Sequence, residues 1–367
     1  MPGVHGESAA RYHRLRLVLG ALELALTVLY LVAVLVSGVG PALSVLAGRL
    51  AEARWWQVAV VAVVLGLGHR LLTLPLGWIR GYWLPRRYGL LHQPLRGWLA
   101  DGLKAALIGG GLALGAVQVL YALIAATPLW WLLAAGVFAA VQIALAVIFP
   151  IWLLPLFYRL TPLVDVELHG RLLALAARAG VPVVGVWIAD QSRKSRTANA
   201  ALAGLGRTRR IILFDTLPGE FTADEVEAVL AHELAHHVHR DTWRALGLQA
   251  GLTVVTLGVV DRLLGVAVTA GGLEGPADPG GLPWLAAILL GLGLLVTPLA
   301  NGFSRWVERQ ADDFALALTG DARAFVAAME RLAALNLAER RPHPLKEMLL
   351  HSHPSIDRRI ARALAGR

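Results

Sequence analysis

Six long apolar segments, separated by more polar connections, set the pattern of this chain. Each is close to the length of about 20 residues that an α-helix needs to cross about 30 Å of hydrocarbon. The first follows a basic leader with Arg11, Arg14 and Arg16. Its apolar run is too long for a secretory signal, so we predict a retained anchor. The predicted spans are Leu17–Gly38, Trp55–Ile79, Ala105–Ala126, Trp130–Leu154, Ala245–Val268 and Trp284–Asn301.

Lysine and arginine are concentrated in alternate connections between the spans. The leader, residues 80–104, residues 159–244 and the C-terminal tail are rich in positive charge, whereas the other connections carry little. An even number of spans with both termini on the positive side fits the rule that cytoplasmic loops carry the excess of Lys and Arg. We therefore expect an integral membrane protein whose termini, and whose polar insert after the fourth span, lie on the cytoplasmic side.

The polar insert, at about residues 159–240, shows the periodicity of a small α+β unit. Thr222 and Glu225 form a capping-box pattern, which predicts a helix that starts near Ala223. Before it we predict one helix and three short strands from the apolar runs. These are the helix His169–Ala179 and strands at Val184–Ala189, through Asn199–Leu202 and at Arg210–Phe214.

The sequence after the fifth span predicts a loop and further helices. The Gly- and Pro-rich stretch Gly271–Gly281 is expected to be a loop on the far side of the membrane. Beyond the sixth span, Arg305–Leu318 is expected to continue as a helix that Gly320 ends. Two more helices are predicted at about Ala322–Ala338 and Ser355–Leu364.

The pattern therefore predicts a mainly α, polytopic membrane protein that carries a small β-sheet. We expect an N-terminal membrane domain at residues 1–158 with four transmembrane helices. A second domain at residues 159–367 would be interrupted by two transmembrane helices, at about 245–268 and 284–301.

Composition supports lipid as the main solvent and limits the chemistry. The chain is 57% hydrophobic and 16% charged, whereas a soluble domain carries about 25% charged residues. There is no cysteine, so a metal could bind only to His, Asp or Glu. The formal net charge is +9. The basic residues flank the apolar segments instead of forming one patch, so we expect a lipid bilayer as partner and no nucleic acid.

The pentapeptide HELAH at residues 232–236 carries the most specific chemistry. His232 and His236 are four residues apart, so on a helix they project from one face and can both bind one Zn²⁺. Glu233 can then act as general base on a metal-activated water. The alternative is a solvated amphipathic helix with incidental histidines. The longer metzincin pattern fails, because His239 and Thr242 stand where its glycine and third histidine should be. We expect His239 to be in the surroundings of the site or exposed to solvent.

A catalytic zinc site needs a third protein ligand, and Glu308 is the candidate. Asp312 lies four residues later on the same predicted helix face and could orient a metal-binding histidine through its other ring nitrogen. Without the HELAH segment, both would be interpreted as surface carboxylates that pair with Arg305 and Arg309.

Three segments together resemble a known family. HELAHHVHRD at residues 232–241, ERQADDFAL at 308–316 and HSHPSIDRRI at 351–360 are similar to the CAAX prenyl protease type 1 family of integral-membrane zinc endopeptidases. Heat-shock proteases of the HtpX type are relatives of that family. The resemblance is close over about residues 149–359. It implies a gluzincin-like α+β zinc protease domain and an intramembrane chamber closed by that domain.

The resemblance also implies roles for individual residues. His232, His236 and Glu308 would bind one Zn²⁺ per chain, with Glu233 as general base and later proton donor. His353 and Arg359 would hold the substrate carbonyl and the developing oxyanion, and Asn199 with Ala200 would lie on the strand that aligns the substrate backbone. Physical reasoning agrees that peptide hydrolysis needs an activated water and positive donors where negative charge develops.

The substrate is less defined than the chemistry. The chain has six predicted spans where eukaryotic members of the family have an additional one. Its Ala-, Leu-, Val-, Gly- and Arg-rich composition is typical of a high-GC bacterial protein, for which we expect the plasma membrane and no prenylated CAAX substrate. One alternative is a membrane quality-control protease that cleaves peptide or protein substrates without CAAX preference. A second is a non-enzymatic transporter or channel that merely carries the HELAH segment.

Overall fold

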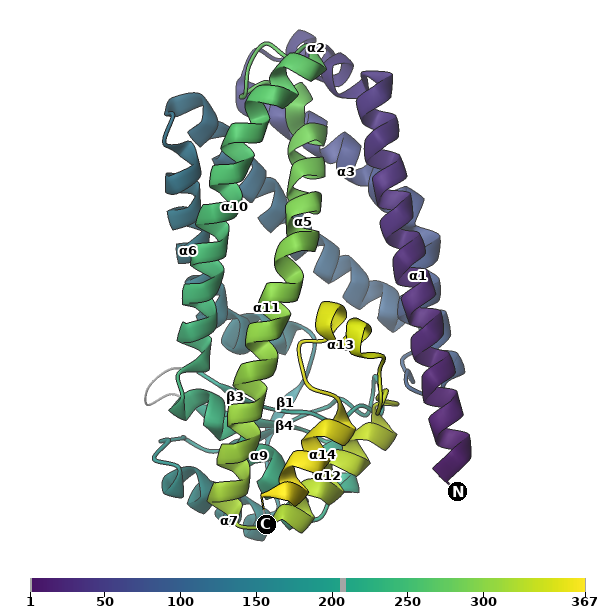
Figure 1. Ribbon diagram of the computed structural model, residues 1–367, viewed down its shortest axis with the longest axis vertical. Helices are drawn as coiled ribbons and strands as arrows, with labels where there is room; N and C mark the ends of the chain where they lie inside the picture. Colours follow the sequence, from purple (N-terminus) through teal and green to yellow (C-terminus); the bar gives the residue numbers. More distant parts are fainter. Residues whose placement is uncertain (1, 205–208, 367) are drawn as a thin grey trace.

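The computed structural model describes residues 2–204 and 209–366. Long helices fill one end of the molecule, and shorter helices with a small sheet fill the other (Figure 1). Both termini lie at the end that holds the sheet (Figure 1). This arrangement is what an even number of membrane crossings produces.

Among the described residues, six helices are long and apolar enough to cross a membrane, which confirms the six predicted spans. The structure extends most of them by several residues beyond the apolar runs. The largest difference is α11, which joins the predicted sixth span and the predicted helix at 305–318 into one continuous helix of 38 residues. Gly320 ends it with φ 69°, as expected for a left-handed cap. The six long helices are α1 (Pro2–Ser37), α3 (Arg54–Trp78), α5 (Leu95–Ala126), α6 (Trp130–Ile148), α10 (Asp241–Gly271) and α11 (Leu282–Thr319).

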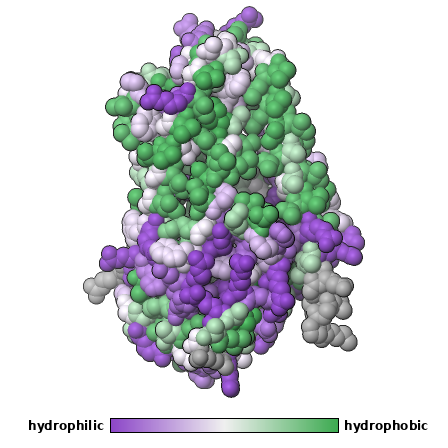
Figure 2. All heavy atoms as spheres, in the orientation of Figure 1, coloured by the Kyte–Doolittle hydropathy of each residue, from purple (hydrophilic) through white to green (hydrophobic). Residues whose placement is uncertain are grey.

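The long helices pack in a closed order. Neighbours in contact are α1 with α3, α3 with α5, α5 with α6, α6 with α10, α10 with α11, and α11 with α1. On the face that Figure 2 shows, their outer surface is mainly apolar, whereas polar residues gather towards the end that holds the sheet. A mostly apolar band beside a polar end is the surface that a bilayer on one side and water on the other require.

Several polar side chains inside the helical part have partners on neighbouring helices. Glu23 accepts a hydrogen bond from Arg80 at 2.6 Å. Asp261 accepts one from the Trp130 indole at 2.8 Å. Each bond satisfies a group that would be destabilising if it faced hydrocarbon alone.

Several short helices were not predicted, because none of them carries an apolar run long enough to cross a membrane. They are α2 (Val39–Leu50), α4 (Leu84–Arg87), α8 (Thr216–Glu220) and α13 (Pro344–Leu350). α2 covers the far end of the bundle, where it packs on α3 and on the single turn at Pro279–Gly281. α13 lies against α11 and leads into the segment that carries His353.

The sheet has four strands in the order β1-β2-β4-β3. β2 and β4 are parallel, and the outer strands pair antiparallel to them. The three predicted strands are confirmed within two residues. β1 was missed because three residues that end in proline carry no periodic signal, although proline is tolerated at a sheet edge. The strands are β1 (Leu160–Pro162), β2 (Val186–Ala189), β3 (Ala200–Ala203) and β4 (Arg210–Phe214).

Four helices build the domain around the sheet. The predicted helix near Ala223 is confirmed as α9, whose capping box is complete: Thr222 accepts from the Glu225 amide and Glu225 accepts from the Thr222 amide. α9 packs on α7, α11, α12 and β3. One apolar core joins these elements, so α9 is fixed on most sides. The four helices are α7 (Val166–Arg178), α9 (Ala223–Val238), α12 (Ala322–Leu335) and α14 (Ile356–Ala365).

Candidate metal centre

Two helices meet at the centre of the candidate site. α9 contributes His232 and His236, one helical turn apart, and α11 contributes Glu308. One ligand atom from each of the three residues lies within 4.8 Å of the other two. The three predicted metal-binding residues are therefore brought together, although Glu308 is at least 72 residues from either histidine in the sequence.

The distances fit a single small cation. His232 Nε2 is 3.2 Å from Glu308 Oε2, and His236 Nε2 is 3.7 Å from Glu308 Oε1. Two atoms that are each about 2 Å from a tetrahedral zinc ion lie about 3.3 Å apart. Glu308 Oε2 is also buried and has no hydrogen-bond partner within residues 2–204 and 209–366. A buried carboxylate oxygen without a donor is destabilising unless a cation binds it, so the donor set fits a metal ion.

Burial rules out the simple surface interpretation of the two carboxylates on α11. Glu308 is 5% exposed and Asp312 is 1% exposed. Arg305, which was considered as a partner, instead donates to the main-chain carbonyls of Glu347 and His351. The two carboxylates therefore belong to the interior of the site.

Asp312 and Arg359 form the surroundings of His232. Asp312 Oδ1 lies 2.9 Å from His232 Nδ1, so the Nε2 lone pair of a neutral His232 faces Glu308. Arg359, on α14, donates to both oxygens of Asp312. Burial alone lowers the pKa of His232, but the neighbouring carboxylates of Asp312 and Glu308 raise that pKa to about 9. A metal ion binds the neutral ring, so metal binding at Nε2 competes with protonation of His232.

A second, equivalent arrangement surrounds His236. Asp241 Oδ2 lies 3.0 Å from His236 Nδ1, and Arg244 donates to Asp241 Oδ1 at 2.7 Å. Arg240 has φ 57°, a left-handed conformation that reverses the chain after α9 and returns Asp241 to the histidine. The sequence analysis gave Asp241 no role. The available signal in the sequence was an aspartate five residues after His236, just beyond the end of the HELAH helix.

Glu233 follows the first histidine and shares its environment. Glu233 is partly buried, and this burial raises its pKa above the ordinary value, against the opposing effect of the two histidines. A carboxylate with a raised pKa is a stronger base than an exposed one.

His353 reaches the centre from the C-terminal segment. Its Nε2 lies 3.2 Å from Glu308 Oε1, and its Nδ1 is 2.9 Å from Ser352 Oγ. His353 remains exposed, so it faces the open side of the centre. Arg359 is placed differently: the guanidinium is engaged with Asp312 and lies 3.3 Å from His232 Nδ1.

Asn199 and Ala200 lie at the sheet edge beside α9. Ala200 begins β3, the last strand in the order β1-β2-β4-β3, and β3 packs on α9. The Asn199 carbonyl accepts from the Phe214 amide, and its side chain is exposed. The predicted substrate strand is thus next to the helix that carries both histidines. No hydrogen bond or ion pair joins these two residues to His232, His236 or Glu308 in the described part of the chain.

Comparison with known proteins defines the family. Residues 162–366 match the model of peptidase family M48, and residues 5–159 match the model described as the CAAX prenyl protease N-terminal region with five membrane helices. The chain belongs to peptidase family M48. This M48 protein is a membrane metalloprotease, a hydrolase of peptide bonds, and the transporter hypothesis is therefore not supported. Over the second match the described structure has four long helices and the shorter α2.

Individual relatives agree with this assignment. The M48 protein is 32% identical to the uncharacterized metalloprotease YhfN of Bacillus subtilis over 336 residues, 90% of this chain and 78% of that protein. It is 34% identical to CAAX prenyl protease 1 of Saccharomyces cerevisiae over 45% of this chain and 37% of the yeast protein. The crystal structure of Ste24p from S. mikatae superimposes with a TM-score of 0.88 at 22% identity and covers 99% of this chain and 90% of Ste24p, which shows the shared fold.

Proposed function

We propose that the protein is an integral-membrane zinc endopeptidase with one Zn²⁺ per chain on His232, His236 and Glu308. One observation carries this proposal: the three ligand atoms converge within 4.8 Å while both histidines have their Nδ1 atoms beside carboxylates. That arrangement leaves both Nε2 lone pairs for a cation. When bound, Zn²⁺ would polarise the scissile carbonyl and lower the pKa of the attacking water.

We propose Glu233 as the general base. It would take a proton from the water as the water oxygen bonds to the carbonyl carbon. It would then pass this proton to the leaving amine nitrogen as the C–N bond breaks. The raised pKa of Glu233 suits both steps, because the group must gain and then lose a proton near neutral pH.

We propose different tasks for His353 and Arg359. His353 is exposed beside Glu308, where its ring N–H could donate to the oxygen that becomes negative. The bonds of Arg359 to Asp312 support, first of all, a role in holding the partner of His232. Direct donation by Arg359 to the substrate stays a prediction.

The substrate would bind as an added strand. β3 is an edge strand, and an extended peptide can pair with such an edge through main-chain hydrogen bonds. Asn199 and Ala200 would align the peptide beside α9. Glu308 lies on α11, the continuation of a membrane-spanning helix, which favours membrane-associated peptide or protein substrates.

From the sequence we propose an N-terminal membrane domain at residues 1–158 and a peptidase domain at residues 159–367. We also propose that the catalytic side faces the cytoplasm across a bacterial plasma membrane. The sequence likewise leaves two proposals for the substrate: proteins with a CAAX-type C-terminus, or peptides without that motif. Cleavage of matched reporters, with and without a prenylated C-terminal motif, would distinguish the two activities.

The test of the mechanism is Glu233→Gln in detergent-purified protein. We expect cleavage to fall by at least about 100-fold while about one zinc per chain is retained. Glu227→Gln, on the same helix but paired with Arg171, is the matched control and should cleave normally. Turnover by a zinc-loaded Glu233→Gln variant would refute the role of Glu233. Absence of zinc from the active wild type would refute the metal proposal.

A further inference from the structure

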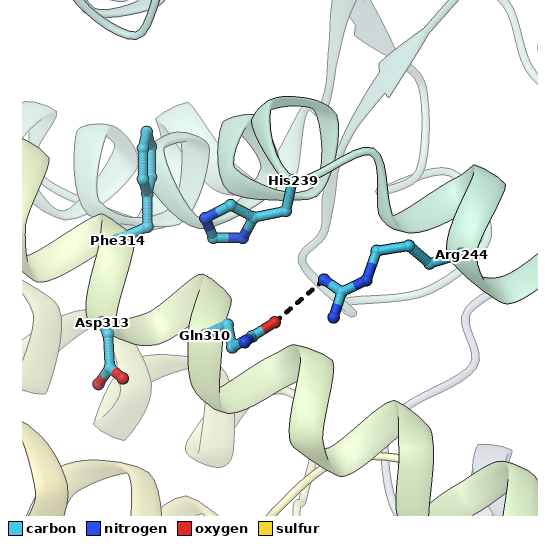
Figure 3. A pocket seen from close by; sticks show the side chains of 5 residues that line it. All are labelled: His239, Arg244, Gln310, Asp313 and Phe314. Carbon is cyan, nitrogen blue, oxygen red and sulfur yellow. Dashed lines mark hydrogen bonds between the residues drawn. The ribbon is translucent and has the colours of Figure 1, made fainter.

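A second hollow lies where the end of α9, the start of α10 and the later part of α11 meet. Its volume is about 490 Å³, and it is lined by His239, Arg244, Gln310, Asp313 and Phe314. Figure 3 shows the His239 ring and the Arg244 guanidinium beside the Gln310 amide, around one space. None of the five residues is a metal ligand, and the proposed hydrolysis uses none of them directly.

The pocket holds hydrogen-bond donors that the described residues do not use. The Nδ1 atom of His239 is buried and has no hydrogen-bond partner in residues 2–204 and 209–366. Arg244 uses its Nη1 for both Asp241 and Gln310. Its Nε and Nη2 form no hydrogen bond in the same part of the chain. Buried or fixed donors without acceptors indicate an acceptor that is not part of the chain.

The one acidic residue in the lining does not take up these nitrogen atoms. Asp313 is held by Arg362 in a two-pronged ion pair with distances of 2.7 and 2.6 Å. Figure 3 shows its carboxylate pointing away from His239 and Arg244. The space between His239 and Arg244 therefore offers unused N–H groups of Arg244 to an acceptor from outside the chain.

The position of the pocket relative to the membrane indicates the source of its ligand. Arg244 directly precedes the apolar run of α10, and Trp306 follows that of α11. Trp243 and Trp306 are both substantially exposed, as aromatic residues at a membrane–water interface commonly are. Lipid headgroups occupy this level. Arg244 covers the Trp306 ring at 4.4 Å, so that aromatic face is not available to a choline cation.

We propose that this pocket binds the phosphate of an anionic phospholipid headgroup, with His239 and Arg244 as its donors. Arg244 supplies a fork that suits phosphate oxygens, and His239 supplies a single N–H. The acyl chains would lie along the apolar part of α10 and α11. The overall charge of +9 also favours an anionic membrane surface.

The experiment measures lipid retention on the full-length protein. Wild type and His239→Ala are reconstituted in nanodiscs of phosphatidylcholine with a minor fraction of phosphatidylglycerol. The lipids that stay bound when the protein is released from the nanodisc are counted by native mass spectrometry. We expect the wild type to retain phosphatidylglycerol selectively. His239→Ala should weaken this retention about tenfold, the effect of one lost hydrogen bond to a charged group.

Controls separate the pocket from general effects. His169→Ala, on α7 and outside the lining, should behave as the wild type, and His239→Gln, which keeps an N–H donor, should recover part of the retention. Equal retention by His239→Ala and the wild type would overturn the proposal. Displacement of phosphatidylglycerol by millimolar inorganic phosphate would assign the pocket to free phosphate instead of lipid. Since retention does not require cleavage, failure here would leave the proposed peptidase activity intact.

Discussion

The two metal-binding histidines are supported by the same three kinds of residue in two different environments. We call His232, Asp312 and Arg359 the inner arm, and His236, Asp241 and Arg244 the outer arm. In the inner arm the side chains are 10%, 2% and 10% exposed, whereas in the outer arm they are 23%, 6% and 29% exposed. In both arms a carboxylate beside Nδ1 sets the tautomer of the histidine. The two arms therefore share the same chemistry and differ in burial, so a comparison of them shows the effect of burial on metal binding and stability.

The arms also differ in how the chain builds them. The inner arm draws its residues from α9, α11 and α14, up to 127 residues apart. The outer arm lies within nine residues and depends on the left-handed turn at Arg240. We infer that loss of the inner arm affects both the metal affinity and the stability of the whole domain. Loss of the outer arm should affect mainly the metal affinity.

The largest expected effect comes from Asp312→Ala. The substitution leaves the Arg359 charge buried without its partner, which destabilises a protein by about 3–5 kcal/mol, and it should lower metal affinity by about 10–100-fold. Metal content after dialysis and thermal unfolding in detergent measure the two effects. The neighbouring Asp313→Ala is the matched control, because its ion pair with Arg362 is exposed and contributes about 1 kcal/mol or less. Equal destabilisation by the two variants would contradict the inner arm.

A smaller effect is expected from Asp241→Ala. Metal affinity should fall by about tenfold, since His236 loses the group that orients it. Stability should fall by less than in Asp312→Ala, because Arg244 is partly solvated and keeps its bond to Gln310. Metal release into a chelator and the unfolding midpoint test this difference. Asp241→Asn, whose amide oxygen can still accept from His236, should lie between Asp241→Ala and the wild type. A loss of stability as large as that of Asp312→Ala would show that the two arms are equivalent.

The smallest effect should come from the turn itself. Arg240→Val places a β-branched residue at φ 57° and should destabilise the protein by about 1–2 kcal/mol. Arg240→Gly, which accepts this conformation, should be close to neutral. Metal release should become faster in the valine variant alone, as measured by chelator competition. Unchanged release in both variants would mean that the turn does not position Asp241.

Features that depend on local spacing could be predicted from the sequence. The six spans follow from length and hydropathy, α9 begins where Thr222 and Glu225 place it, and the four-residue interval of His232 and His236 fixes them on one face. Glu308 was identifiable because a catalytic zinc site needs a third protein ligand and because Asp312 stands four residues later on the same predicted helix face.

Features that depend on distant contacts were not predictable in the same way. The position of Arg359 beside Asp312 requires α14 to pack on α11, which no spacing in the sequence encodes. Asp241 was overlooked because its role depends on an arginine in a left-handed conformation, a state that arginine seldom adopts. β1 and α13 are too short to show a period.

The continuity of α11 has a mechanical consequence. This helix starts on the far side of the membrane at Leu282 and reaches Glu308 and Asp312 without a break, with Pro298 removing one backbone hydrogen bond on the way. A helix that adapts to a thinner or thicker bilayer does so by tilting or bending. Because Glu308 and Asp312, the partner of His232, lie on the same helix, such a tilt would move both together. We therefore expect a change in bilayer thickness to alter the geometry of the candidate metal centre.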